Sequence, residues 1–180
     1  MLIRRNDSTL FVVDEQARLA PAISGREQAL ANTAVLIRAA NRLGVPVLAS
    51  EQYPKGLGPT VPEIAELLPQ EAVMEKVHFC AAAEETVITR IAGLGRSQVV
   101  VAGMEAHVCV LQTALGLKER GYQVYVVADA TASRRPQSHA LAMDRLRLAG
   151  IPAVSTEMVV FEWLARDGTP EFREVLALIK

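Results

Sequence analysis

Apolar segments of strand length alternate with segments of helix length along the chain, and this alternation restricts the possible folds more than any other feature. The apolar runs are rich in valine, short, and continuous rather than interrupted by polar residues. Runs of this kind are typical of strands that are buried on both faces. We predict strands at residues 8–14, 45–50, 72–76, 97–103, 122–129 and 151–156.

The segments between these runs carry apolar residues three and four positions apart, which is the spacing of one helix face. We predict helices at residues 25–44, 82–95, 107–121 and 136–150, followed by a closing helix at 172–180. Four of the segments end at a glycine, a residue that commonly caps helices. These glycines are Gly44, Gly95, Gly121 and Gly150.

Alternating strands and helices predict a parallel sheet with helices on both faces, because right-handed crossovers return the chain to the same end of the sheet. We therefore expect an α/β fold, a three-layer α/β/α sandwich with a mainly parallel, Rossmann-like sheet of roughly six strands. No internal repeat or linker divides the 180 residues, so one domain spanning 1–180 is expected. Ligands in this fold class bind beyond the carboxyl ends of the strands.

Composition argues against polyanionic partners. The formal net charge is −1 and 22% of the residues are charged, so we expect no binding to nucleic acid or to an anionic membrane surface. The apolar runs are far shorter than the roughly 20 residues of a membrane span, and the first residues, MLIRRNDST, contain no apolar signal core. A cytoplasmic location is expected.

Cysteine and histidine spacing offers no metal or cofactor motif. The chain has neither an HxxxH nor a CxxC pattern, and YPKGLGPT lacks the ending of a phosphate-binding loop. We therefore expect no metal and no cofactor. Cys80 and Cys109 are expected to be free thiols, since two widely spaced cysteines are no disulfide framework.

Three residues of different chemistry stand where predicted strands end. Asp14 closes the first strand, Lys76 closes the third, and Cys109 follows the fourth. Each has an ordinary structural interpretation: a turn aspartate, a lysine that reaches solvent, and a buried cysteine acting as a small apolar residue. If a helix begins near residue 106 or 107, however, Cys109 lies in its first turn, where free N–H groups favour a thiolate and lower its pKa.

With Asp14, Lys76 and the segment GMEAHVCV in this order, the sequence resembles the isochorismatase-like cysteine hydrolases over most of its length. The resemblance implies a catalytic triad in which Asp14 is the general base, Lys76 its charge partner and Cys109 the nucleophile. It also implies a cis peptide bond between Met104 and Glu105, with an oxyanion hole formed by the backbone N–H groups of Glu105 and Cys109.

The same resemblance places Gln16 in the substrate pocket and makes a homo-oligomer, a dimer or larger, the expected state. Tyr53, Phe79 and His107 are candidates for the pocket wall, although packing explains each equally well. The chain departs from the metal-binding nicotinamidases, because SEQYPKGLG replaces their Asp-x-His motif after the second strand.

The predicted function is a metal-independent hydrolase that cleaves a C–N bond of a small amide or carbamoyl compound through a thioester at Cys109. An isochorismatase-type vinyl ether hydrolase is the first alternative, but those relatives lack the nucleophilic cysteine. The second is a non-catalytic module, either a redox or ligand sensor that uses a reactive cysteine or an oligomeric scaffold.

Overall fold

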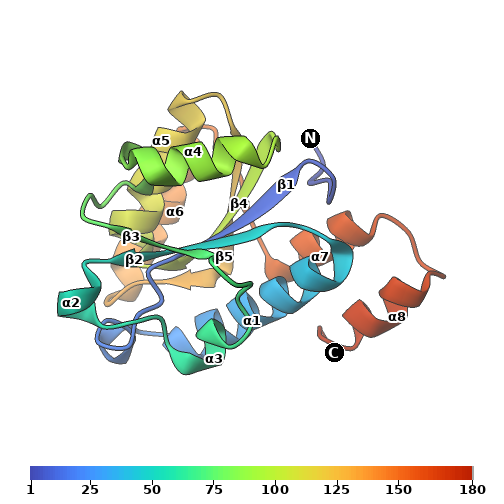
Figure 1. Cartoon of the computed structure of the whole chain (residues 1–180), viewed down its shortest axis with the longest axis horizontal. Helices are drawn as coiled ribbons and strands as arrows, with labels where there is room; N and C mark the ends of the chain where they lie inside the picture. Colours follow the sequence, from blue (N-terminus) through green and yellow to red (C-terminus); the bar gives the residue numbers. More distant parts are fainter. Residues whose placement is uncertain (180) are drawn as a thin grey trace.

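The strands expected from the sequence form one parallel sheet in the computed structural model, which describes residues 1–179 (Figure 1). Within these residues the sheet has six strands in the order β3-β2-β1-β4-β5-β6, and every neighbouring pair is parallel. The fold-class prediction is therefore confirmed, with a wholly parallel sheet in place of a mainly parallel one. The strands are β1 Ser8–Val13, β2 Val47–Gln52, β3 Val73–Lys76, β4 Gln98–Met104, β5 Gln123–Ala132 and β6 Ala153–Val154.

Helices cover both faces of this sheet, with α1, α7 and α8 on one side and α4, α5 and α6 on the other (Figure 1). Short turns join them, and one turn, η3, is π-helical. The four glycines predicted as caps all have left-handed φ angles, between 64° and 89°. The elements are η1 Ala20–Ala22, α1 Arg26–Leu43, α2 Pro54–Leu57, α3 Pro62–Ala65, η2 Ala81–Ala83, α4 Glu85–Gly93, η3 Ala106–Val110, α5 Leu111–Glu119, α6 Pro136–Leu148, α7 Thr156–Leu164 and α8 Pro170–Leu176.

Alternate residues of β1 belong to two separate hydrophobic cores. Leu10 and Val12 face the core that contains α1 and the fully buried Trp163 of α7. Phe11 and Val13 face the core formed with α4, α5 and α6. Burial on both faces explains why this strand is a continuous apolar run, and it holds the polar residues that follow the strand in a fixed place.

The C-terminal part of the chain differs from the prediction. The strand predicted at 151–156 is reduced to Ala153–Val154, because Ser155 accepts a hydrogen bond from Met158 N and thereby begins α7. The segment TEMVVFEWL was not predicted as a helix. The closing helix α8 is shorter than predicted, and Lys180 lies outside the described residues.

The ends of β1 and β4 come together where the chain crosses from one half of the sheet to the other. β1 pairs with β2 on one side and with β4 on the other, which makes this the switch point of the topology. Gly103 allows the close approach: a Cβ atom there would lie 2.1 Å from Val13 O, and its φ is 117°. The residues after both strands are thus neighbours. No helix in residues 1–179 has the length and apolar character of a membrane span.

Candidate active site

The structure brings Asp14, Lys76 and Cys109 together at the carboxyl end of the sheet. Lys76 Nζ lies 2.7 Å from Asp14 Oδ2, and both side chains are completely buried. Lys76 therefore does not extend to solvent, and Asp14 is no exposed turn residue. The thiol of Cys109 is near both charged groups, since Asp14 and Lys76 each influence its pKa.

Asp14 is held from two directions. Its backbone N–H donates to Ser50 O at 3.1 Å, and Ser50 Oγ donates to Asp14 Oδ1 at 2.7 Å. The residue has a left-handed φ of 51°, a conformation that is uncommon outside glycine and that recurs at functional sites. Oδ2 lies 2.7 Å from Lys76 Nζ, and both the charge and a hydrogen bond of this lysine act against the rise in the pKa of Asp14.

Burial raises the pKa of Asp14 above its ordinary value, and the ammonium group of Lys76 is the strongest opposing influence. The balance between burial and the Lys76 charge decides whether Asp14 is ionised. A buried carboxylate without a cation would become protonated, whereas one beside a buried lysine can stay charged and act as a base.

The thiol of Cys109 does not have the lowered pKa that its place in the first helical turn suggested. Burial and the neighbouring Asp14 carboxylate raise this pKa to about 12, while Lys76 acts in the opposite direction. The loss of solvent is the largest of these influences, and the charge of Asp14 is the next largest. The thiol thus keeps its proton until Asp14 removes it, and its pKa lies on the opposite side of the ordinary value from the one that a first-turn position favours.

The turn that carries Cys109 begins as a π-helix, which changes its backbone hydrogen bonds. Glu105 O accepts from Val108 N at 3.1 Å and from Val110 N at 3.2 Å. In an α-helix the N–H of Cys109 would donate to this oxygen, but among the described residues that bond is not formed. The peptide bond between Met104 and Glu105 is cis. The wide turn thus leaves the Cys109 amide unbonded to Glu105 O.

The Glu105 side chain is anchored by a residue that the sequence did not single out. Its carboxylate accepts from the backbone N–H of Arg134 at 2.9 Å and from the guanidinium Nε at 3.1 Å. The carboxylate is buried, whereas Arg134 is 61% exposed. The loop after β5 therefore holds the turn that contains Cys109.

Gln16 is buried, and its side chain is bonded to the backbone of neighbouring segments. Its Nε2 donates to Gln52 O at 3.1 Å and to Gly58 O at 2.7 Å, and its Oε1 accepts from Gln52 N at 2.8 Å. The amide is fully used in holding the loop between β2 and α3. Gln16 thus shapes the loop above the site.

The other candidates for the pocket wall come from segments that touch the triad. Tyr53 is 57% exposed, and its backbone N–H donates to Lys76 O at 2.9 Å. Phe79 is 55% exposed, and its carbonyl lies 3.5 Å from Lys76 Nζ. His107 belongs to the same turn as Cys109, and its Nδ1 lies 3.0 Å from Ser133 Oγ.

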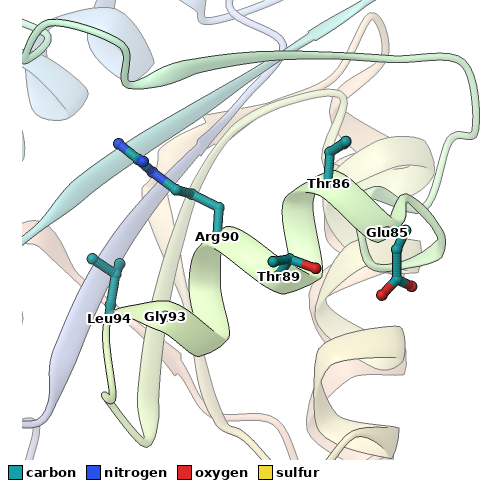
Figure 2. A pocket seen from close by; sticks show the side chains of 6 residues that line it. All are labelled: Glu85, Thr86, Thr89, Arg90, Gly93 and Leu94. Carbon is teal, nitrogen blue, oxygen red and sulfur yellow. The ribbon is translucent and has the colours of Figure 1, made fainter.

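Surface hollows do not by themselves mark this site. One of about 580 Å³ is formed by the outer face of α4 and the residue after it, and contains none of the predicted site residues (Figure 2). Another, of about 300 Å³, is lined by Tyr53, Lys76 and Val77 among others and lies beside the triad. Within residues 1–179 no cluster of three or more His, Cys, Asp or Glu side chains is suited to a metal ion.

A parallel α/β sandwich with a buried aspartate, lysine and cysteine at its switch point combines the fold and the residues by which the sequence resembles the isochorismatase-like cysteine hydrolases. The Isochorismatase domain matches residues 8–158 of the chain. The chain therefore belongs to the isochorismatase family. Isochorismatase domain-containing protein 1 of Danio rerio is 39% identical over 173 residues, which are 96% of this chain and 61% of that protein.

Solved structures show the same fold. MAR1 ribonuclease from Caenorhabditis elegans has a TM-score of 0.93 at 34% identity, covering 99% of this chain and 92% of that one. YcaC from Pseudomonas aeruginosa, solved with covalent acrylamide, has a TM-score of 0.92 at 25% identity, covering 98% and 91%. Escherichia coli YcaC, described as an octameric hydrolase of unknown specificity, has a TM-score of 0.89 at 24% identity, covering 99% and 87%.

Proposed function

We propose that this protein hydrolyses a C–N bond of a small amide or carbamoyl compound, with Cys109 as a covalent nucleophile. The observation that carries the proposal is the buried ion pair of Asp14 and Lys76, whose charges both influence the pKa of the buried Cys109 thiol. A carboxylate beside a protonated thiol is a base beside a nucleophile, which is the arrangement that covalent hydrolysis requires.

In the first half of the reaction, Asp14 accepts the thiol proton while the sulfur attacks the carbonyl carbon. Lys76 stabilises the negative charge that passes between carboxylate and sulfur. The tetrahedral intermediate then collapses, the C–N bond breaks, and Asp14 returns the proton to the departing ammonia or amine. A thioester remains on Cys109.

The carbonyl oxygen becomes an oxyanion during this attack, and backbone N–H groups can stabilise it. The Cys109 N–H, which is not bonded to Glu105 O, is suited to this role. We propose the Glu105 N–H as the second donor, because it lies at the start of the same turn. The anchoring of Glu105 by Arg134 supports a rigid oxyanion hole.

Water completes the reaction by attacking the thioester, with Asp14 again as the base. The carboxylic acid leaves and the thiol regains its proton. No step of this scheme uses a cofactor or a metal ion. We therefore expect the activity to persist after dialysis against EDTA. The small-molecule substrate contacts Tyr53, Phe79 or His107 in this scheme.

Ammonia release from a panel of small amides and carbamoyl compounds tests the proposal. Wild type should turn over at least one of them, Cys109→Ala should be inactive, and Cys80→Ala should match wild type. Undiminished activity in Cys109→Ala would contradict a covalent mechanism. The panel should also contain an isochorismate-type vinyl ether and an RNA, because relatives carry those names.

Acrylamide provides a second test that needs no substrate. A relative was solved with covalent acrylamide, and we propose that it also attaches to this chain, at Cys109. Peptide mass spectrometry should find the adduct there and not in Asp14→Asn. Reversible oxidation of Cys109 by peroxide, without hydrolysis of any compound, would favour a sensor module instead.

We also propose that the protein forms a homo-oligomer. Leu141 and Leu148 are 70% and 90% exposed, and their spacing of seven residues places them on one face of α6. Light scattering coupled to size-exclusion chromatography should give a mass of at least two chains. A monomeric mass over the range of working concentrations would contradict this.

A further inference from the structure

The ammonium group of Lys76 has a contact outside the triad. Its Nζ lies 2.7 Å from Asp14 Oδ2 and 2.6 Å from Gln52 Oε1. It also lies 3.2 Å from His78 O and 3.5 Å from Phe79 O. A buried ammonium group needs hydrogen bonds for its three N–H donors as well as an opposite charge. The closest uncharged acceptor is the side chain of Gln52.

The amide of Gln52 can face Lys76 in only one orientation. Its Nε2 donates to Val77 O at 2.7 Å, which directs Oε1 toward the ammonium group. A flipped amide would set its NH₂ group against the ammonium and its oxygen against Val77 O, so both contacts would be repulsive.

The backbone of Gln52 is held as firmly as its side chain. Gln16 Oε1 accepts from Gln52 N at 2.8 Å, and Gln16 Nε2 donates to Gln52 O at 3.1 Å. Gln52 is therefore fixed at both ends and presents one neutral oxygen to Lys76.

A neutral acceptor differs in its effect from a charged one. A carboxylate at position 52 would share the positive charge of Lys76 with Asp14 and would repel Asp14 as well. An apolar side chain would remove the shortest of the hydrogen bonds and leave the ammonium with Asp14 and two longer backbone contacts. A glutamine accepts a hydrogen bond from the lysine, and because it is neutral it does not compete with Asp14 for the positive charge.

We propose that Gln52 is a positioning residue that fixes the Lys76 ammonium between Asp14 and Cys109 without competing for its charge. The proposal rests on the proposed function, because it assigns Lys76 to the reacting groups. The titratable and charged groups around this ammonium are Asp14 from the end of β1, Cys109 from η3, and the pair of His78 and Glu84, whose side chains meet at 2.9 Å beyond β3.

The test compares Gln52→Glu with Gln137→Glu, which makes the same change at an exposed position on α6. The rate of acrylamide addition to Cys109 is measured against pH by peptide mass spectrometry. Gln52→Glu should move the midpoint upward by roughly one pH unit, because Asp14 loses part of its cation. Gln137→Glu should keep the wild-type midpoint.

Gln52→Met supplies the second arm, with Gln137→Met as its control. Addition of acrylamide should slow by roughly tenfold or more at neutral pH, and kcat for any amide substrate should fall more than KM changes. A residue that only supports the loop would lower the melting temperature and leave the pH midpoint of Gln52→Glu unchanged, and that outcome would overturn the proposal.

Failure of the proposed function can be told apart from failure of this inference. The ¹³C signal of the Asp14 carboxyl group reports its titration directly and requires no reaction at Cys109. If acrylamide does not label the wild type, the role of Cys109 fails, while an upward shift of the Asp14 midpoint in Gln52→Glu still supports the placement of Lys76. If the midpoint of the Asp14 signal is the same in Gln52→Glu as in the wild type, the proposed role of Gln52 is refuted.

Discussion

Asp14 and Glu15 are adjacent carboxyl groups that are equally buried and yet have opposite surroundings. Asp14 faces a lysine at 2.7 Å, a serine and a cysteine. Glu15 Oε1 accepts a hydrogen bond from Thr33 Oγ1 at 2.8 Å, and its Oε2 has no partner among residues 1–179. The surroundings of Asp14 therefore contain a buried cation, whereas those of Glu15 contain only a neutral hydrogen-bond donor.

The comparison shows that burial alone does not make a carboxyl group reactive. Burial raises the pKa of Glu15 to about 8, and the more distant carboxylate of Glu63 adds to this effect. Without a cation Glu15 remains protonated at neutral pH. Asp14 experiences the same loss of solvent, but Lys76 opposes it. A buried cation is thus what separates a base from a structural acid.

The largest expected difference between the two residues is in activity. Asp14→Asn keeps the shape of the side chain and removes its ability to take a proton, so kcat should fall by about 10³-fold. Glu15→Gln makes the matching change one residue later and should stay within a few-fold of wild type. Steady-state hydrolysis of an amide substrate measures both, and equal losses would mean that Asp14 has no special role.

Removing the cation should convert the surroundings of Asp14 into those of Glu15. Lys76→Met leaves a buried carboxylate without its partner, and the free energy of unfolding should fall by about 3–5 kcal/mol. The double variant Asp14→Asn with Lys76→Met carries no charge at either position and should recover most of this loss. Urea denaturation at pH 7 measures the difference. If the double variant is as unstable as Lys76→Met, the loss comes from packing rather than charge.

The pH dependence of stability should reveal the neutral acid. In the unfolded chain Glu15 loses its proton near its ordinary value of 4.5, but in the folded protein only near 8. Below 4.5 both states hold the proton, and between 4.5 and 8 the folded state holds more protons, so stability falls with rising pH. Above 8 both states are ionised and the effect is constant.

Glu15→Gln lacks this titration. Its free energy of unfolding relative to wild type should therefore rise by about 1.4 kcal/mol per pH unit through this window and then level off. Melting temperatures measured from pH 4 to pH 9 check it, and a constant difference between the two proteins would refute a protonated Glu15.

The place of Asp14 could be predicted from the sequence, but its contrast with Glu15 could not. The apolar run LFVVD marks a buried strand that ends in an acid, and parallel strands bring such ends together with Lys76 and Cys109. Whether Glu15 meets a lysine or a threonine depends on how α1 packs, which no local pattern encodes. The contacts of Gln52 likewise exist only once the loop after β2 is folded.

Helix α7 was missed for a different physical reason. Its sequence TEMVVFEWL is apolar on nearly every side, with Met158 and Phe161 48% and 42% exposed, so no amphipathic period identifies it. The available signal was Ser155 as an N-cap. The helices of clear period, α1 and α6, lie within a few residues of their predicted limits.

The smallest expected effect concerns the hydrogen bond that Thr33 donates to Glu15. Thr33→Val removes the hydroxyl from a buried site and should cost about 1 kcal/mol, while Thr33→Ser, which retains the hydroxyl, should cost less at the same pH. This bond lowers the pKa of Glu15, so its removal should move the upper limit of the pH window above the wild-type limit. This shift of the pH window must vanish in a Glu15→Gln background, because an amide has no proton to lose in this range. Melting curves of wild type, Thr33→Val, Thr33→Ser, Glu15→Gln and the double variant Glu15→Gln with Thr33→Val, measured across the same pH series, show how much this one hydroxyl contributes to the pKa of Glu15. An identical pH window with and without the Thr33 hydroxyl would assign the whole shift to burial.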